Sequence, residues 1–507
     1  MRKIIFAFLA AACAVAATAA PKPKLVVAIA VDQFRYDYLT RFRSEYKGGL
    51  NQLLTKGAVF TNARYEHFPT VTAIGHSTFL SGATPAISGI IGNDWWERSE
   101  NRNVTSVSDD KTKLLGGRGG AGSSPQRLLV STVGDEIKMA DGGRSKVIGI
   151  SLKDRAAILP AGHMADGAYW FDGKTGNFVS STYYFEDLPG WVKDFNSSHP
   201  GDKYKGMKFG KKTLPSEPGE KLYEGLAPTP FGNEIIEAFA ERAMQAEQLG
   251  HHDVTDLLAV SFSSNDYVGH ALGPDSAEVH EISVATDKLL GKFFAYIAQN
   301  VGMQNVLVVM TADHGVAPVP EVNVARKMPG GRMPGKMVTD TIQQALTAKY
   351  GEGKWIVSPS EHSVYLNLDL IAQKNLDPAE VDKVAAQACL KLPHVSRVYT
   401  REQLMSGATL EDQIGKRVQN GFYGRRSADI EILLEPYWMF TGGTGTTHGT
   451  TYSYDAHVPV IFMGPGVKPG RYNNTIAVND IAPTLATMLD IETPSGSVGR
   501  ALSEMME

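Results

Sequence analysis

The sequence contains very little cysteine. Only two cysteines occur in 507 residues, Cys13 and Cys389. Cys13 lies in an N-terminal segment that we expect to be cleaved off, so a single thiol would remain in the mature chain. This excludes an internal disulfide framework. We therefore expect stability to come from core burial, with bound metal as a further source.

The chain also lacks a charge bias and, beyond its N-terminus, a long apolar run. It carries 50 Lys and Arg against 54 Asp and Glu, a formal net charge of -4. That balance indicates neither a nucleic-acid-binding surface nor an acidic tail. No stretch after residue 20 is long and apolar enough to span a bilayer, so no membrane anchor is expected in the mature chain. Hydrophobic residues make up 43%, as in ordinary globular proteins.

The first 20 residues have the features of a secretory signal peptide. A basic start is followed by an apolar run at 4–16 and by the small residues Ala17-Thr18-Ala19. We predict that residues 1–20 are removed and that the protein is periplasmic or secreted. A membrane anchor is disfavoured because the run is short. A lipoprotein is disfavoured because Ala10 stands where a larger aliphatic residue is preferred.

Apolar runs of strand length recur along the chain. They cover residues 25–31, 146–152, 256–262, 306–311 and 459–464. Continuous apolar runs of this length are typical of strands buried on both faces of a parallel sheet. Helical patterns lie between them, at 49–56, 73–81, 128–139, 279–297, 378–392 and 479–489. The sequence therefore predicts an α/β fold, with a mostly parallel central sheet and helices on both faces.

Two regions interrupt this pattern. Residues 165–230 are irregular and aromatic and are predicted to be an insertion near the active site, while 321–440 carry their own helices and strands and are predicted to be an inserted α+β subdomain. The glycine-rich residues 99–125 are predicted to be a flexible surface loop, because no strand leads into them as a phosphate-binding loop would require. The core would then consist of residues 24–164, 231–320 and 441–507.

Charged side chains follow four of the predicted strands. A single Asp at a strand end is as often a turn or a cap as a site residue. The carboxyl ends of parallel strands, however, meet at one edge of the sheet, where ligands bind. We therefore predict that this edge carries a site formed by Asp32, Lys153, Arg155, Asp266, Asp313 and His314.

Carboxylate and imidazole groups are spaced as metal ligands. Asp266 and His270 are four residues apart and would share one face of a helical turn. Oxygen and nitrogen donors together suit zinc or a similar divalent ion. A third ligand is needed, and His448 is the candidate. His457 is ranked lower because it stands at the entrance to a strand.

A hydroxyl stands at the predicted start of the helix over 73–81. Free backbone N–H groups at a helix N-terminus suit phosphate oxygens. Thr70 and Thr72 both lie near this point. His76, in the first turns, is expected to brace the helix rather than to bind metal.

Taken together, these motifs resemble those of the alkaline phosphatase superfamily, which includes the nucleotide pyrophosphatases and phosphodiesterases. The resemblance covers most of the mature chain and is closest to the single-chain phosphate-irrepressible alkaline phosphatases. The matching segments are Ala30-Val31-Asp32, Thr72-Ala73-Ile74-Gly75-His76, Gly89-Ile90-Ile91-Gly92-Asn93, Ser151-Leu152-Lys153-Asp154-Arg155, Asp266 with His270, Ala312-Asp313-His314-Gly315 and Thr447-His448-Gly449.

The resemblance implies two Zn²⁺ ions. One would be bound by Asp266, His270 and His448. The other would be bound by Asp32, Asp313 and His314, together with the Thr72 oxygen.

The resemblance also implies the catalytic roles. Thr72, four residues before His76, stands where the family nucleophile does and is preferred to Thr70. Asn93, Lys153 and Arg155 would hold the phosphoryl oxygens.

The function implied is that of a secreted zinc-dependent alkaline phosphatase. It would hydrolyse small phosphate monoesters broadly, through a phosphothreonine and a two-metal in-line displacement, and release inorganic phosphate; a monomer is favoured. The nearest alternative is a phosphodiesterase or nucleotide pyrophosphatase on the same scaffold. The diesterase pattern, however, has Phe-Pro-Asn where Ala73-Ile74-Gly75 stand here. A diesterase would also have little use for two cationic side chains, Lys153 and Arg155, at the phosphoryl group.

Two further alternatives are ranked lower. A sulfatase is disfavoured because Thr72, rather than the Cys or Ser of a Cys/Ser-x-Pro-x-Arg segment, stands at the expected nucleophile position. A non-catalytic periplasmic metal-binding protein would need the ligands but not Thr72, Asn93, Lys153 and Arg155.

Overall fold

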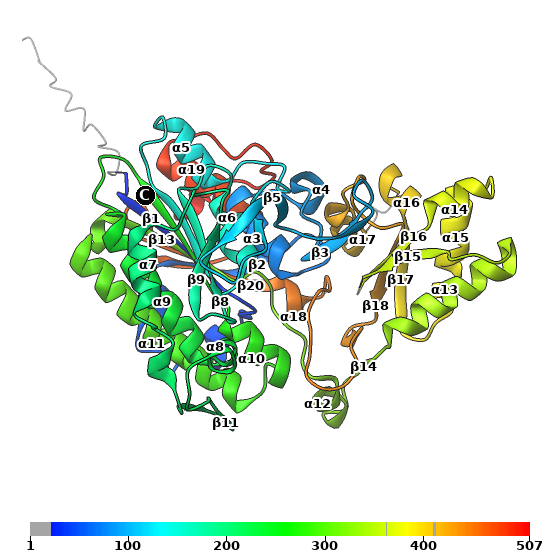
Figure 1. The fold of residues 1–507 in the computed structure, drawn as a ribbon, viewed down its shortest axis with the longest axis horizontal. Helices are drawn as coiled ribbons and strands as arrows, with labels where there is room; N and C mark the ends of the chain where they lie inside the picture. The colour runs from blue at the N-terminus through cyan, green and yellow to red at the C-terminus, as the bar shows by residue number, and fades with distance from the viewer. Residues whose placement is uncertain (1–21, 361, 409–411) are drawn as a thin grey trace, which may run out of the picture.

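The computed structural model describes residues 22–360, 362–408 and 412–507, so the predicted signal peptide lies outside it. Figure 1 shows a large body built on one sheet and a smaller body beside it, formed by the inserted subdomain (residues 321–440). No helix in the described part of the chain has both the length and the apolar character needed to cross a membrane.

One large mixed sheet forms the core of the larger body. Its strands lie in the order β21 (Gly470–Ala477), β2 (Ala58–Arg64), β20 (His457–Met463), β13 (Val306–Thr311), β1 (Leu25–Val31), β12 (Asp256–Phe262), β7 (Val147–Ser151), β8 (Gly167–Asp172), β9 (Asn177–Ser181), β5 (Ser108–Leu115) and β6 (Ala121–Ser123).

The centre of this sheet is parallel and its flanks are largely antiparallel. The strands β13, β1, β12, β7 and β8 run in the same direction. Antiparallel pairs attach β20 on one side and β9, β5 and β6 on the other. Every residue of β1, β12 and β13 is buried, as their continuous apolar sequences require. The predicted α/β class is confirmed.

Helices cover both faces of the sheet. On one face α2 (Gly49–Lys56), α9 (Pro230–Ala246) and α11 (Ala277–Asn300) pack together; on the other lie α3 (Thr72–Ser81), α5 (Val133–Ala140), α6 (Asp154–Ala161) and α19 (Ile481–Leu489). The remaining helices of the larger body are α1 (Tyr38–Arg41), α4 (Pro85–Ser88), α7 (Gly190–Ser197), α8 (Glu220–Leu226), α10 (Ser264–Leu272) and α18 (Ser453–Ala456), and α12 (Pro320–Ala325) leads into the subdomain.

The prediction of a flexible loop over 99–125 is wrong. This segment holds β4 (Arg102–Thr105), which pairs with β3 (Asp94–Glu97), and the strands β5 and β6 at one end of the central sheet. Its polar composition follows from its position, because an antiparallel edge can leave one face to water. The helix predicted over 128–139 starts later, at Val133, because the Thr132 side chain caps it together with Asp135.

The predicted insertion at 165–230 is partly central sheet, since β8 and β9 belong to it. Its aromatic residues pack on α9 of the larger body. The rings of Phe178 and Phe239 stack with centroids 3.7 Å apart, and Tyr169 contacts Phe239 edge to face. The short pair β10 (Lys208–Phe209) and β11 (Lys212–Thr213) completes the segment.

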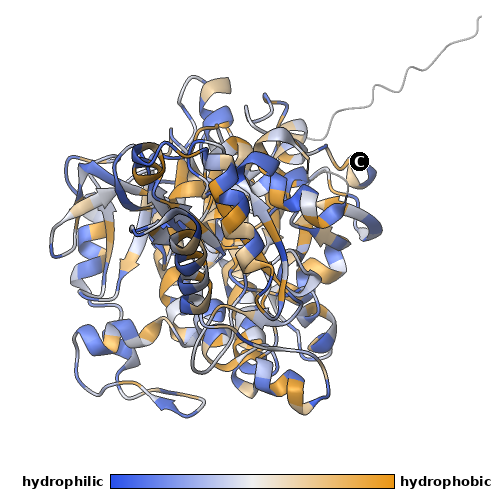
Figure 2. Ribbon diagram, turned by 90° about the vertical axis from the view of Figure 1, so that its right-hand side faces the viewer, coloured by the Kyte–Doolittle hydropathy of each residue, from blue (hydrophilic) through white to orange (hydrophobic). Residues whose placement is uncertain are grey.

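The inserted subdomain has its own antiparallel sheet, in the order β15 (Ile356–Pro359), β16 (Ser363–Leu366), β18 (Ile430–Leu434) and β17 (Val395–Thr400). Its helices are α13 (Gly335–Tyr350), α14 (Leu368–Gln373), α15 (Pro378–Cys389), α16 (Arg401–Ser406) and α17 (Gln413–Gly421). Figure 2, seen from this side, shows helices that carry both hydrophilic and hydrophobic residues. The apolar faces enclose a separate core around Trp355, with Cys389 buried in it as a free thiol.

Ion pairs between arginine and carboxylate side chains fasten the subdomain to the larger body. Arg98 donates to both carboxylate oxygens of Asp429, at 2.8 Å each. Arg417 donates to Glu66 at 3.0 Å. The short strands β14 (Gly331–Arg332) and β19 (Trp438–Met439) pair where the chain enters and leaves the subdomain.

Candidate active site

The predicted site residues meet at one edge of the central sheet. The neighbouring strands β13, β1, β12 and β7 are parallel, so their carboxyl ends lie side by side. Asp313 and His314 follow β13, Asp32 follows β1, Asp266 opens α10 after β12, and Lys153 with Arg155 follows β7. The structure therefore brings together residues that are far apart in sequence, and the side chains of Asp32, Lys153 and Asp266 are in direct contact.

Thr72 is the first residue of α3, and its side chain is buried in the site. Val71 before it is extended (φ -133°, ψ 160°), which starts the helix at Thr72. The Thr72 hydroxyl lies 3.5 Å from His314 Nε2. Thr70 is different, because its hydroxyl donates to the Thr450 carbonyl at 2.8 Å and is used in the loop. Of the two hydroxyls, the geometry leaves Thr72 for chemistry.

Three histidines are fixed in the same tautomer. In each, Nδ1 lies 2.7–2.9 Å from a backbone carbonyl oxygen, which can only accept a hydrogen bond. The proton of the neutral imidazole is therefore on Nδ1, and the Nε2 lone pair is left for a ligand, the arrangement typical of metal-binding histidines. The pairs are His270 with Thr446, His314 with Gly315, and His448 with Thr70.

His76 and His457 are placed differently. His76 uses both ring nitrogens, on the Thr72 carbonyl at 2.9 Å and the Ser261 hydroxyl at 2.8 Å, so it braces α3 as expected. His457 bonds the Thr61 carbonyl at 3.0 Å, beside β2. His76 therefore has both ring nitrogens in use, and His457 is held at the far end of its strand pairing rather than among the ligand groups.

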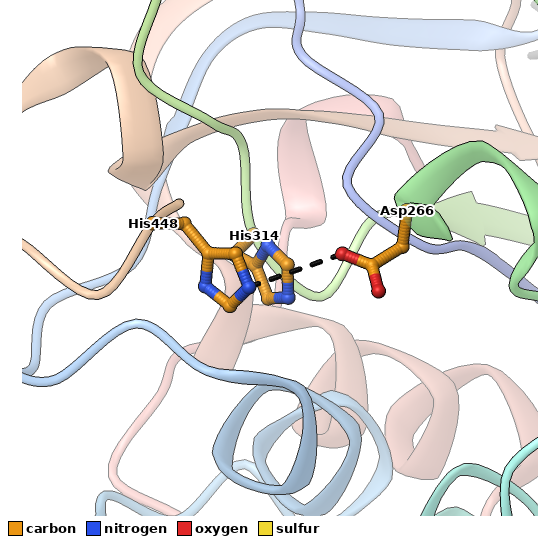
Figure 3. Close-up of side chains that lie close together, drawn as sticks. All are labelled: Asp266, His314 and His448. Carbon is orange, nitrogen blue, oxygen red and sulfur yellow. Dashed lines mark ion pairs between the residues drawn. The ribbon is translucent and has the colours of Figure 1, made fainter. Parts of the chain in front are cut away.

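Two groups of side chains could each hold a cation. One consists of Asp32, Asp313 and His314 and the other of Asp266, His314 and His448, with ligand atoms within 4.8 Å of one another. Figure 3 shows the second group, with His448 Nε2 3.9 Å from Asp266 Oδ1. His270 Nε2 lies 3.1 Å from the same oxygen. His314 thus stands between the two groups, and its ring stacks on that of His448 at 3.4 Å.

The donor set fits a divalent cation. Asp32 Oδ1 and Asp313 Oδ2 are buried and have no hydrogen-bond partner among the described residues. Both face His314 Nε2, at 3.6 and 3.4 Å. Three lone pairs would repel one another in a buried space unless a cation lies between them. Carboxylate oxygen and imidazole nitrogen are the ligands that zinc-like ions take.

Lys153 links the two groups electrostatically. Its ammonium donates to Asp32 Oδ2 at 2.6 Å and to Asp266 Oδ2 at 2.7 Å. Burial alone would lower the pKa of Lys153, but the two carboxylates outweigh it and raise that pKa. Burial and the neighbouring Asp266 and Asp313 raise the pKa of Asp32. Burial alone would raise the pKa of Asp266, but Lys153 and His270 outweigh it and hold that pKa down. One ammonium against three carboxylates leaves an excess of negative charge for a cation to balance.

Asn93 stands at the start of α3, and Arg155 lies on a neighbouring helix. Asn93 accepts a hydrogen bond from the Ala73 N–H at 2.9 Å through Oδ1, which leaves its side-chain N–H groups for a ligand. Arg155 lies in α6, which packs on α3. Its Nε is buried without a hydrogen-bond partner in the described part of the chain, and its guanidinium is 3.9 Å from Asp154.

Sequence reasoning missed Gln33. Its backbone N–H donates to Asp313 Oδ1 at 3.0 Å, and its side-chain Nε2 donates to Asp266 Oδ1 at 2.7 Å. It adopts a left-handed conformation (φ 60°) to make both contacts. A Cβ at Gly269 would lie 1.8 Å from Gln33 Oε1, so this glycine is required for the amide to fit. The only sequence signal was its position directly after Asp32.

A parallel sheet whose carboxyl edge carries paired metal-ligand groups and a helix-terminal threonine is the architecture of the alkaline phosphatase superfamily. Within it, this chain belongs to the type I phosphodiesterase / nucleotide pyrophosphatase family, whose model matches residues 26–457.

Relatives of full length are found. The chain is 39% identical over 525 residues to a protein of Myroides odoratus named calcium-transporting ATPase, covering 96% of this chain and 95% of that protein. It is 38% identical over 517 residues to alkaline phosphatase PhoV of Synechococcus elongatus, covering 96% and 93%. The crystal structure of wild-type alkaline phosphatase PafA superposes with a TM-score of 0.89 at 36% identity, covering 97% of this chain and all of that one.

Proposed function

We propose that this chain is a periplasmic or secreted alkaline phosphatase that hydrolyses small phosphate monoesters, with two Zn²⁺ ions as cofactors and a phosphothreonine on Thr72 as intermediate. Relatives named alkaline phosphatase, similar to this chain over nearly its whole length, support the reaction class. The observation that carries the proposal is the Thr72 hydroxyl, which opens α3 and lies 3.5 Å from His314 Nε2 among the metal-ligand groups. A pure metal-binding protein would have no use for a hydroxyl at that point.

Each ion would have its own ligands. Asp32, Asp313 and His314 would hold one ion together with the Thr72 oxygen, and Asp266, His270 and His448 would hold the other. The stacked position of His314 between the two groups brings the sites close together. When bound, zinc would supply Lewis acidity, which lowers the pKa of a hydroxyl or of water and offsets charge on phosphoryl oxygens.

The reaction would occur in two displacements at phosphorus. The Thr72 oxygen forms a bond to phosphorus, the bond from phosphorus to the alcohol breaks, and the alcohol leaves. Water then attacks the phosphothreonine, which frees the Thr72 oxygen and releases inorganic phosphate. The N-terminal end of α3 and the side-chain N–H groups of Asn93 could donate hydrogen bonds to the phosphoryl oxygens.

Arg155 and Lys153 would supply the positive charge that a monoester dianion needs. The forked guanidinium of Arg155 can pair with two phosphoryl oxygens at once. Its buried Nε has no hydrogen-bond partner within the described residues, which suits that role. Lys153 is bonded to Asp32 and Asp266, so its charge acts from beside the ligands.

A phosphodiesterase or nucleotide pyrophosphatase is the alternative, because the matching family model carries that description. A diester has one fewer negative charge and a second bulky group. Two cations at the phosphoryl group would therefore benefit a monoester more. Ala73-Ile74-Gly75 after Thr72 also departs from the diesterase pattern.

The test compares hydrolysis of an aryl phosphate and a bis-aryl phosphate by the same zinc-supplied protein. We expect the monoester to be strongly preferred in kcat/KM. A preference for the diester would reject the proposal in favour of the alternative. Loss of hydrolysis on chelation, with recovery on adding zinc, is the accompanying control, and activity that survives chelation would reject the metal assignment.

A further inference from the structure

A large cavity lies beside the site, between the larger body and the inserted subdomain. Its volume is about 690 Å³, in the range of small-molecule pockets. Val71 and Asn93, which flank Thr72 and the start of α3, form part of its wall. The opposite wall comes from the subdomain. The cavity therefore opens from the place where the phosphoryl group would sit.

Several aromatic side chains line the cavity, beside charged ones such as Lys336 and Glu431. The larger body contributes Phe68 and Trp95, and the subdomain contributes Tyr365, Phe422 and Phe440. Aromatic rings present flat apolar faces, on which another flat ring stacks or packs edge to face. This part of the wall can therefore offer packing contacts to a ring.

One polar group in this wall has no partner. His362 is buried, and neither of its ring nitrogens has a hydrogen-bond partner among the described residues. Phe68 and Phe440 hold the ring edge to face, at 5.3 and 5.6 Å. The Ile432 N–H donates to the His362 carbonyl at 2.8 Å and fixes its backbone. Burial lowers the pKa of His362 to about 4, so the imidazole is neutral, with one N–H donor and one acceptor nitrogen.

His362 also lies close to the predicted metal site. A Cβ at Gly449 would be 2.6 Å from His362 Nε2, so the imidazole rests on the backbone directly after His448. A ring attached directly to the ester oxygen of a substrate would therefore come within reach of the His362 imidazole. Buried polar groups are nearly always satisfied, and an exception calls for an explanation. A ligand in the cavity provides one.

We propose that this cavity binds the leaving group of the substrate, and that it favours a flat ring with a hydrogen-bonding edge. The aromatic wall would stack on the ring, and His362 would pair with its polar edge. His362 thereby becomes a specificity-determining residue contributed by the inserted subdomain. This inference rests on the proposed phosphomonoesterase activity and adds a substrate class to it.

The test measures kcat and KM for three monoesters. Methyl phosphate has no ring, phenyl phosphate has a ring without a polar edge, and 4-carbamoylphenyl phosphate has both. Each variant is compared with the parent on the same substrate, so intrinsic differences in leaving-group reactivity cancel.

His362→Leu should raise KM for the carbamoyl ester about tenfold and leave the other two esters within about twofold, since one hydrogen-bonding group is lost. His362→Gln, which keeps a donor and an acceptor, should recover much of that loss. Phe440→Ala should weaken both aryl esters by about five- to tenfold and spare methyl phosphate. Tyr350→Ala, in the subdomain but outside the cavity lining, is the control and should change none of the three.

The melting temperature of His362→Leu supplies a second readout. Because the imidazole forms no hydrogen bond within the described residues, its loss should leave the melting temperature unchanged or higher. Equal losses on all three esters, or no loss on the carbamoyl ester, would overturn the inference, as would a lower melting temperature. If the parent hydrolyses none of the three, the proposed function itself fails. If it hydrolyses all three with unaltered ratios in every variant, only the cavity's role fails.

Discussion

Replacing Gln33 by methionine would isolate its role in holding a carboxylate ligand. Methionine keeps the length of the side chain and the Cβ, so the left-handed backbone carries the same strain. The backbone N–H to Asp313 is kept as well. Only the donation from Nε2 to Asp266 Oδ1, now 2.7 Å long, is lost.

The expected effect follows from that one contact. A hydrogen bond to a charged group contributes about 1.5–3 kcal/mol, which corresponds to roughly 10- to 100-fold in an equilibrium constant. Removing a side chain that hydrogen-bonds to a metal ligand typically weakens metal affinity by a similar factor. Binding of the ion at Asp266 should weaken by that factor, while the ion at Asp32, Asp313 and His314 should keep its affinity within about threefold.

The assay titrates metal-depleted protein with zinc against a competing chelator and measures kcat/KM at saturating zinc. Two binding steps are expected, with only one weakened, and activity should return when zinc is saturating. Gln343→Met is the matched control. Gln343 in α13 bonds Thr347 and Gly353 at 3.0 and 2.8 Å, far in sequence from every ligand, so it should change stability but not zinc affinity. Two unchanged steps, or equal weakening of both, would refute the reasoning.

Three other changes test separate parts of the argument. Thr72→Ala should keep zinc but lower turnover at least about a thousandfold and form no covalent phosphate, which mass spectrometry would detect; unchanged turnover would show that the nucleophile is another residue. Arg155→Ala should lower kcat/KM for an aryl monoester at least about tenfold more than for a diester, and equal losses would remove its assigned role. Burial and the neighbouring Asp429 raise the pKa of Asp382 to about 8, so the native state keeps a proton that the unfolded chain loses. The free energy of unfolding should then fall as pH rises from about 4 to 8. Asp382→Asn lacks this titration, so its stability relative to the parent should increase by up to about 1.4 kcal/mol per pH unit, as measured by thermal unfolding at pH 5 and 8. A stability difference that did not grow with pH would contradict this.

Strands and their endings were predictable because their signals are local. The apolar runs at 25–31 and 256–262 coincide with β1 and β12, and the helix at 49–56 coincides with α2. Once the strands were assigned to one parallel sheet, the meeting of Asp32, Asp266 and Asp313 at one edge followed from topology.

The remaining features depend on tertiary contacts that leave no local pattern. Gln33 acts through two carboxylates from distant segments, and nothing in its neighbours signals this. The position of His314 between both ligand groups depends on how His448 returns to the sheet edge. The strands at 108–115 and 121–123, at one end of the sheet, were missed because they are polar and glycine interrupts their periodicity.

The two stacked histidines also flank the inserted subdomain in the sequence. His314 precedes the inserted subdomain and His448 follows it, and their rings lie 3.4 Å apart. The inserted segment 321–440 therefore begins and ends at nearly the same point of the larger body. Descendants of one ancestor could exchange, resize or redecorate this segment while the chemistry at the sheet edge stayed as it was. Catalysis and substrate preference would then evolve as separate traits within one polypeptide.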